Sequence, residues 1–134
     1  MLASRFFASN RSLQGLYHGK DVRKGFSYTF SHKATKRKFK PNVIKNKKFW
    51  SHILDRYIQI SVTTKALKCI EKRGNFDNYI LKTPEREMRS EYGLMLKNHM
   101  LKRLQDPMYE VGYLPKQHKI FRNKHKERSK RLAE

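Results

Sequence analysis

The clearest pattern along the chain is a strict alternation of apolar and polar residues between Tyr57 and Thr63. The apolar positions are Ile58, Ile60 and Val62, and the positions between them are Tyr57, Gln59 and Ser61. A period of two predicts a strand with one face on a core and the other face open. The segment Val43–Trp50 precedes it, so we expect an antiparallel hairpin that turns near Leu54-Asp55-Arg56.

Further extended segments are expected on the N-terminal side of this hairpin. Gly19 and Gly25 bracket a polar stretch within residues 15–30, and its flanks are aromatic and β-prone. This arrangement predicts two short strands joined by a loop. Another strand is expected around Lys36–Lys40. Pro41 has no amide hydrogen for a ladder, so that strand is broken or lies at a sheet edge.

Helical signals replace the strand pattern after residue 63. Thr63 or Thr64 can cap a short helix that runs through Arg73, and Gly74 is suited to the position just beyond its end. Asp77–Lys82 predicts another short helical segment.

A long helix is predicted from Thr83-Pro84 to about Gln105, ending at Asp106-Pro107. The start combines a hydroxyl cap, a proline at the first helical position and acidic residues in the first turn. The apolar stripe of this helix is Met88, Tyr92, Met95 or Leu96, His99 or Met100, and Leu104. We interpret the stripe as core or partner packing and not as a cofactor site.

These elements predict an α+β fold. A small antiparallel β-hairpin core spans residues of about 15–63, and short helices and one long C-terminal helix follow it, with basic extensions. The expected divisions are an N-terminal basic segment (1–14), a core domain (15–83) and a helical C-terminal extension with a basic tail (84–134). The tail from residue 116 onward is expected to be a cationic helix or an extended segment.

The charge of the chain points to a polyanionic partner. Lys and Arg number 32 against 11 Asp and Glu, which gives a net charge of +21 and leaves a small hydrophobic fraction of 37%. Residues 19–50 hold eleven Lys and Arg with one acidic residue, and residues 116–134 hold eight with two. Residues 85–115 are balanced, with five of each sign. Strong self-repulsion in the two basic blocks favours binding to a polyanion.

The densest cationic run is Ser31–Asn42, which has five Lys and Arg, one His and no acidic residue. Cations packed this closely gain affinity by releasing the counterions of a phosphate backbone. Phe39 supplies an apolar or stacking anchor, and Pro41 stiffens the chain before Asn42. We interpret the run as a shaped segment of a folded protein that lies on nucleic acid.

The sequence gives little support for catalysis, metal binding or membrane insertion. Cys69 is the single cysteine, so we expect no disulfide and no thiolate metal cluster, and we interpret it as a small buried hydrophobic residue. The six His residues lack metal-binding spacing, and Asp21 near His18 is the nearest acid–base pairing. No apolar run approaches the ~20 residues of a membrane helix. We therefore expect no enzyme activity, cofactor, metal, small-molecule substrate or membrane span.

The first twelve residues, MLASRFFASNRS, contain two Arg, three Ser and no acidic residue. This composition is typical of an organelle-targeting presequence. A disordered basic N-terminus is the alternative interpretation.

Between Gly19 and Gly74 several short blocks occur in a fixed order. They are Gly19-Lys20, Gly25, Ser31-His32, Thr35-Lys36-Arg37-Lys38-Phe39, Pro41-Asn42, Phe49-Trp50, Val62-Thr63 and Gly74. This order resembles the L-28 family of large-subunit ribosomal proteins. Tyr79–Pro84 and the long helix after it resemble the mitochondrial branch of that family.

Two departures from the family pattern stand out. The chain is slightly shorter than common bacterial forms between His32 and Thr35. Some bacterial members carry zinc-binding cysteine pairs near the Gly-Lys step, where this chain has Leu16-Tyr17-His18. One His cannot complete a four-ligand site, so no structural metal is expected.

The resemblance implies a structural constituent of the large ribosomal subunit that stabilises folded rRNA on the tRNA-exit side and supports translation. It implies a mitochondrial matrix location, with a bacterial-type cytoplasmic ribosome as the alternative. Neighbouring large-subunit proteins are expected along the nearly neutral segment 84–105. The rival interpretation is an off-ribosome RNA chaperone or a nucleoid-type nucleic-acid-binding protein. A membrane-surface peptide is disfavoured, because the basic C-terminal segment lacks an apolar face.

The residues expected to bind RNA lie in or beside the basic blocks. They are Lys20, Ser31, His32, Lys33, Thr35, Lys36, Arg37, Lys38, Phe39, Lys40, Asn42, Lys45, Lys47, Lys48, Lys65 and Lys68. Arg37 is expected to bridge phosphates with its forked guanidinium, while the lysines act as point charges. For Phe39, Phe49 and Trp50 we favour packing beneath the hairpin over stacking on an unpaired base.

Overall fold

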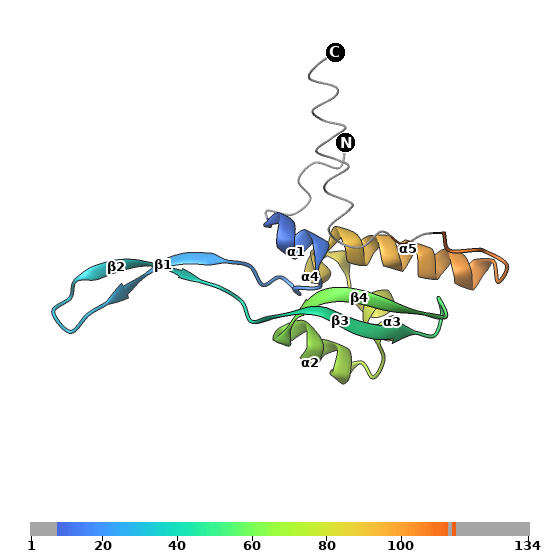
Figure 1. The fold of residues 1–134 in the computed structure, drawn as a ribbon, viewed down its shortest axis with the longest axis horizontal. Coiled ribbons are helices and arrows are strands. Elements are labelled where there is room, and N and C mark those ends of the chain that lie inside the picture. The colour runs from blue at the N-terminus through green and yellow to red at the C-terminus, as the bar shows by residue number, and fades with distance from the viewer. Residues whose placement is uncertain (1–7, 113, 115–134) are drawn as a thin grey trace, which may run out of the picture.

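The structure is a computed structural model that describes residues 8–112 and residue 114, and it has the expected α+β architecture (Figure 1). The elements in chain order are α1 (Asn10–Gln14), β1 (Arg23–Tyr28), β2 (Ala34–Phe39), β3 (Val43–Ser51), β4 (Arg56–Thr63), α2 (Thr64–Lys72), α3 (Phe76–Lys82), α4 (Glu85–Met88) and α5 (Glu91–Gln105). The expected 116–134 tail and residues 1–7 lie outside the described residues.

The strands form two separate antiparallel hairpins, β1–β2 and β3–β4. The predicted β3–β4 hairpin is confirmed, with its turn at residues 52–55. Ile58, Ile60 and Val62 are buried, while Tyr57 and Gln59 on the opposite face are exposed, as the alternation predicts. Inside this turn Oδ2 of buried Asp77 accepts hydrogen bonds from the amides of residues 52 and 53, which fixes the turn against α3.

The prediction of two strands within residues 15–30 is wrong, because only β1 forms there. Leu16 makes one isolated parallel bridge with Val62 instead. The amide of Leu16 donates to the carbonyl of Ser61 at 2.9 Å. The chain then turns away through His18 and Gly19, whose φ angles are +48° and +72°. Two consecutive left-handed residues end an extended run, so no strand can continue there.

The β1–β2 hairpin projects away from the helices and from β3–β4 as an extended arm (Figure 1). We call residues 22–42 the arm. The expected strand at Lys36–Lys40 is present as β2, and it ends at Phe39, two residues before Pro41. Both strands of a two-stranded sheet are edge strands, so β2 agrees with the expectation of a broken or edge strand.

Helix α2 follows β4 without a loop, and its caps match the prediction. The hydroxyl of Thr63 accepts from the amide of Ala66 at 3.2 Å and donates to the carbonyl of Tyr17 at 3.1 Å. Arg73 ends the helix, and Gly74 follows with a φ of +83°, a left-handed conformation that glycine adopts without strain.

The expected single helix from residue 83 to residue 105 is broken into α4 and α5. Arg89 adopts a φ of +45° between them, and Ser90 caps the new helix by accepting from the amide of Gly93 at 2.9 Å. The Ser90 hydroxyl also donates to the carbonyl of Leu13. A Cβ at Gly93 would clash with the sulfur of Met88. The break between α4 and α5 therefore depends on the missing side chain at this position.

One hydrophobic core joins the sheet to the helices. Its buried residues are Leu16, Leu54, Ile58, Ile60, Val62, Ala66, Ile70, Phe76, Tyr79, Ile80, Met88, Tyr92, Leu96, Met100 and Val111. The predicted α5 stripe is therefore largely confirmed, although Leu104 is 57% exposed. Cys69 is half-buried against this core, less deeply than expected. Residues on both sides of the expected boundary at position 83 contribute to this one core. Helix α1 also packs against α5 across that boundary.

We predict that Leu96→Ala lowers the free energy of unfolding by about 2–5 kcal/mol, because it leaves a cavity at a fully buried position. The matched control is Leu104→Ala on the same helix, which is expected to change it by less than about 0.5 kcal/mol. Urea unfolding followed by circular dichroism measures both. Equal losses would contradict the packing of Leu96 in the core.

Candidate nucleic-acid interface

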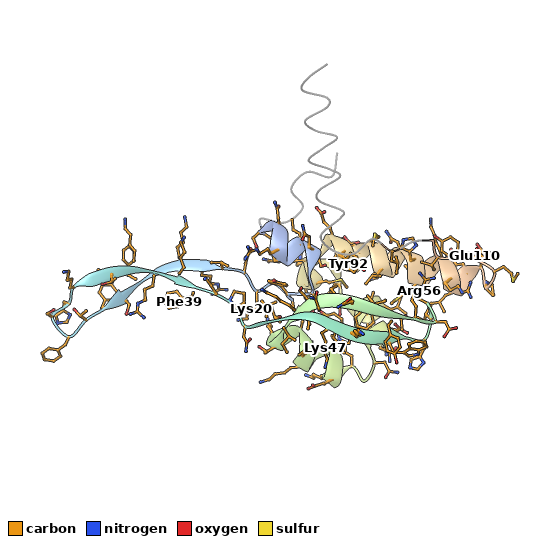
Figure 2. All side chains as sticks on the ribbon, in the orientation of Figure 1. Lys20, Phe39, Lys47, Arg56, Tyr92 and Glu110 are labelled. Atoms are coloured by element: carbon orange, nitrogen blue, oxygen red, sulfur yellow. The ribbon has the colours of Figure 1, made fainter. Side chains whose placement is uncertain are left out.

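All sixteen residues expected to bind RNA have exposed side chains. Ten of them, from Ser31 to Lys40 and at Asn42, belong to the arm. Between Val22 and Asn42 there are seven Lys and Arg and no acidic residue. The arm has therefore no carboxylate of its own to neutralise this charge. Figure 2 shows its side chains standing out on both sides of a narrow ribbon.

The register of β1–β2 divides the arm into two chemically different faces. On the first face Lys24 pairs with Lys38, Phe26 with Lys36, and Tyr28 with Ala34. On the second face Arg23 pairs with Phe39, Gly25 with Arg37, and Ser27 with Thr35. Directly paired residues of an antiparallel ladder share a face. The first face thus joins lysines to aromatic rings, and the second carries the two guanidinium groups.

Phe39 lies over Gly25 on the second face, where a Cβ at Gly25 would be 2.9 Å from the phenylalanine ring. A side chain at position 25 would therefore displace the ring of Phe39. Phe39 is still 53% exposed, so the expected packing beneath a hairpin core is wrong for this residue. The arm has no core for it to pack into.

The tip of the arm is a closed turn from Thr29 to Lys33. The amide of Thr29 donates to the carbonyl of Lys33, and the amide of His32 donates to the carbonyl of Thr29. The hydroxyls of Ser31 and Thr29 are 3.1 Å apart, and His32 has a φ of +58°. Ser31 and His32, expected to contact RNA, thus also shape the turn. It presents Phe30 fully to solvent.

The base of the arm brings separate parts of the candidate site together. The carbonyl of Asn42 accepts from the amide of Thr64 at 3.3 Å, which places Asn42 beside the start of α2 and Lys65. The amide of Lys20 donates to the carbonyl of Tyr17 on the other chain segment of this base. Lys68 lies one turn further along α2, away from the arm.

The lysines of β3 do not form one continuous track. Lys45 lies in a register shift between Ile44 and Lys47, next to Asn46 with a φ of +55°. Lys47 pairs with Ile60 and Lys48 with Gln59, so these adjacent lysines point to opposite faces of the sheet. The expected continuation of the cationic track is thus divided between two faces.

Phe49 and Trp50 also separate, as neighbours in a strand must. Phe49 stacks on Phe76 with ring centroids 4.9 Å apart and packs against the core, as we favoured. Trp50 lies on the open face, 39% exposed, with its ring edge-on to Tyr57 at 4.7 Å.

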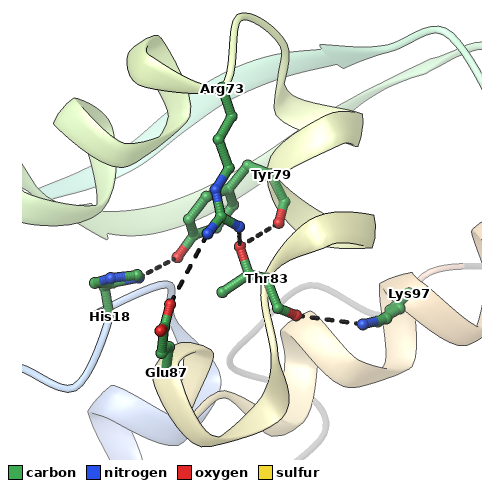
Figure 3. A network of polar contacts seen from close by, with 6 residues as sticks. All are labelled: His18, Arg73, Tyr79, Thr83, Glu87 and Lys97. Atoms are coloured by element: carbon green, nitrogen blue, oxygen red, sulfur yellow. Dashed lines mark hydrogen bonds and ion pairs between the residues drawn. The ribbon is translucent and has the colours of Figure 1, made fainter.

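A polar network that the sequence analysis missed connects several segments outside the arm (Figure 3). We call the described residues outside the arm the body. The ring of His18 lies 3.1 Å from the hydroxyl of Tyr79. Arg73 donates to the hydroxyl of Thr83, which donates to the carbonyl of Tyr79. The network extends to Glu87, 3.9 Å from Arg73, and to Lys97, which donates to the carbonyl of Thr83. His18 and Lys97 come from outside residues 73–87, which hold the other members, so no local spacing reveals the complete network.

The electrostatics of this network favour a neutral His18. Burial lowers the pKa of His18 below its ordinary value, the charge of Lys65 lowers it further, and Glu87 opposes the shift. Burial likewise raises the pKa of Tyr79, so its hydroxyl stays protonated. A similar lowering affects the pKa of His99, where burial acts together with the charges of Lys102 and Arg56.

Within residues 8–112 and residue 114, no three His, Cys, Asp or Glu side chains gather as metal ligands would. In the same part of the chain, every helix is too short or too polar to cross a membrane.

Comparisons with known proteins agree with the resemblance found in the sequence. Residues 14–73 match the family described as "Ribosomal L28 family". The matched residues, 14–73, belong to that family. It is 39% identical over 98 residues to "Large ribosomal subunit protein bL28m" of Bos taurus, covering 69% of this chain and 38% of that protein. For the protein of the same name from Xenopus laevis the identity is 36% over 94 residues, covering 68% and 37%.

A shorter match links the chain to a bacterial member of the family. "Large ribosomal subunit protein bL28" of Rickettsia typhi is 39% identical over 64 residues, covering 48% of this chain and 65% of that protein. The bL28m matches are longer than this one, which confirms the resemblance to the mitochondrial branch. The chain spans less than two thirds of the length of each of these relatives. These matches support the expectation that the chain is not an enzyme.

We predict that the free energy of unfolding falls as the pH decreases below about 6.5. The folded-state pKa of His18 lies below its unfolded value, so the unfolded state binds the extra proton in this range. His18→Asn, which suits a positive φ, is expected to reduce the difference between urea unfolding at pH 7.5 and pH 5.5. Part of this difference is expected to remain, because the pKa of His99 is also lowered in the folded state.

His32→Asn is the matched control, because His32 also has a positive φ but is exposed at the arm tip. An equal reduction in both variants would show that the packing around His18 does not govern the pH dependence.

Proposed function

We propose that the protein is a structural constituent of the large subunit of the mitochondrial ribosome, where its arm stabilises folded rRNA. The observation that carries this proposal is the arm itself, with seven Lys and Arg, no acidic residue and no residue in the hydrophobic core. A two-stranded hairpin without a core is marginally stable in water. A phosphate-rich surface would neutralise its charge and hold its shape. Membership of the family and the names of its relatives support the ribosomal setting.

The cations of the arm point to both of its faces. Lys36 and Lys38 share one face of β2, while Arg37 lies on the other. The arm can therefore neutralise phosphates on both of its sides when it lies between two RNA segments. Arg37 suits bidentate contact with phosphate oxygens, and Thr35 on the same face can bond to sugar or phosphate oxygens. Lys20, Lys65 and Asn42 extend the proposed contact to the arm's base.

Neighbouring ribosomal proteins are the proposed partners of segment 84–105. Most of its apolar stripe is buried in the protein's own core, which narrows the proposal to the end of α5. Leu101 and Leu104 are exposed there, together with Met108 just beyond the helix. This end of the molecule lies opposite the arm (Figure 1), so RNA and protein contacts need not compete for one surface.

An off-ribosome RNA chaperone or nucleoid-type protein is the alternative, and sedimentation distinguishes it. The full chain is expected to sediment with large subunits of mitochondrial ribosomes and to remain after a high-salt wash. Leu104→Ala is expected to weaken this retention without loss of folding. A protein that washes off into the free fraction would be acting as the alternative class.

We predict that joint replacement of Lys36, Arg37 and Lys38 by Ala makes the log–log salt dependence of rRNA binding shallower by about two to three units. Each phosphate contact contributes about 0.7–0.9 to that slope. The measurement is the affinity for a large-subunit rRNA transcript, determined by filter binding between about 50 mM and about 300 mM salt, a range over which electrostatic screening changes strongly.

The matched control replaces Lys82, Arg86 and Lys102 by Ala, which removes the same charge from exposed helical positions outside the arm. Its slope is expected to stay close to that of the unaltered protein. If both triple variants change the slope equally, binding depends on net charge and not on the arm.

A further inference from the structure

The arm exposes more aromatic surface than a free cationic ribbon needs. Phe26 is 53% exposed, Tyr28 69% and Phe30 fully. Apolar surface gathered on a projecting element marks an interaction site. Phosphate neutralisation leaves the rings unexplained, because a ring carries no charge to pair with a phosphate. The hydroxyl of Tyr28 can donate to a phosphate oxygen, and the Tyr28→Phe variant below separates that contact from stacking. Some other part of the partner must cover the rings.

The arrangement of Phe26 and Tyr28 narrows the choice of ligand. Both lie on the first face of the arm, two residues apart on β1, and lysines surround them. Lys36 stands directly opposite Phe26, and Lys24 pairs with Lys38 one step nearer the base. A ligand that fits this face has flat apolar surfaces and negative charges a short distance away. An unpaired nucleotide has both, since its base is flat and its phosphate is anionic.

The spacing along the strand fits a base as well. Alternate residues of a strand are attached about 6.8 Å apart, since each residue advances about 3.4 Å. Bases along one nucleic-acid strand also repeat at about 3.4 Å. One base can therefore lie between the two rings or extend a stack from either of them.

We infer that the face formed by Lys24, Phe26, Tyr28, Lys36 and Lys38 is a stacking platform for unpaired bases of the bound RNA. This inference rests on the proposed rRNA-binding function and assigns the two faces of the arm different tasks. The face with Arg23 and Arg37 contacts phosphates, and the ring of Phe39 on that face lies over Gly25. The face with Phe26 and Tyr28 selects places where RNA has bases free of pairing. A regular duplex offers such bases only at its ends.

The test compares two probes, an RNA stem with an unpaired loop and a fully paired duplex of the same length. Tyr28→Leu keeps an apolar side chain but removes the ring. In the full chain it is expected to weaken loop binding by about fivefold or more, and duplex binding by less than about twofold. Its salt slope is expected to stay unchanged, because no cation is lost. Tyr28→Phe keeps the stacking ring and is expected to retain loop affinity.

Tyr57→Leu is the matched control, because Tyr57 is exposed to nearly the same extent, 70%, but lies on β4 away from the arm. It is expected to leave loop binding unchanged. A fluorescent base analogue in the loop gives a second readout, since stacking on Tyr28 is expected to change its emission in the unaltered protein and not in Tyr28→Leu.

The outcomes separate this inference from the proposed function. If Tyr28→Leu binds the loop as well as the unaltered protein while the Lys36, Arg37 and Lys38 variant still alters the salt slope, the platform is refuted and the RNA-binding arm remains. Normal RNA binding by Tyr28→Leu together with poor retention on large subunits would assign the aromatic face to a protein neighbour and overturn the inference. If neither Tyr28→Leu nor the joint Lys36, Arg37 and Lys38 replacement changes RNA binding, the proposed RNA-binding role of the arm is rejected.

Discussion

Mutual repulsion among cations is the constraint on which this structure depends. A chain of 134 residues with a net charge of +21 can fold only if its like charges stay apart from the buried core and from one another. The structure meets this constraint by keeping the core and the densest positive charge in different parts of the molecule. The nearly neutral helices α4 and α5 complete the core together with β3–β4, and the densest cations are carried on an arm that projects into solvent. In an extended ribbon, neighbouring side chains alternate in direction, which separates adjacent charges further.

The body needs its polar network because its core is small. Arg73, Tyr79 and Thr83 connect the end of α2 to the middle and the C-terminal end of α3, and His18 ties the segment before the arm to the same place. Neutral His18 matters here, because an additional cation beside Lys65 and Arg73 would add to the repulsion. The network therefore couples the position of the arm's first strand to the helices. The ion pair between Arg73 and Glu87 is long, at 3.9 Å, and partly exposed, so it contributes little by itself.

Local rules predicted the parts of the fold in which sequence and contact are close together. The alternation from Tyr57 to Thr63, the Thr63 cap and the Gly74 stop each involve neighbouring residues. The break at Arg89 escaped prediction because Thr83-Pro84 was the stronger start signal, and Ser90 was the cap that mattered. The candidate cations were found by composition, but their division between two faces depends on the register of β1 with β2. Phe26, Tyr28 and Phe30 do alternate with Ser27 and Thr29, but the cationic β2 has no such period, so the sequence does not show which residues lie opposite the rings.

A ribbon serves the proposed task better than a disordered basic tail of the same composition would. A tail must lose backbone entropy of roughly 1–2 kcal/mol per residue when it is ordered on RNA. The arm has already lost part of this entropy through its ladder, the closed turn at Thr29–Lys33 and the Gly25–Phe39 contact. Only a ladder also fixes which side chains share a face. A flexible tail with the same residues would not hold Phe26 and Tyr28 on one face and Arg23 and Arg37 on the other, so it could not offer RNA the two different faces that the proposals assign to the arm.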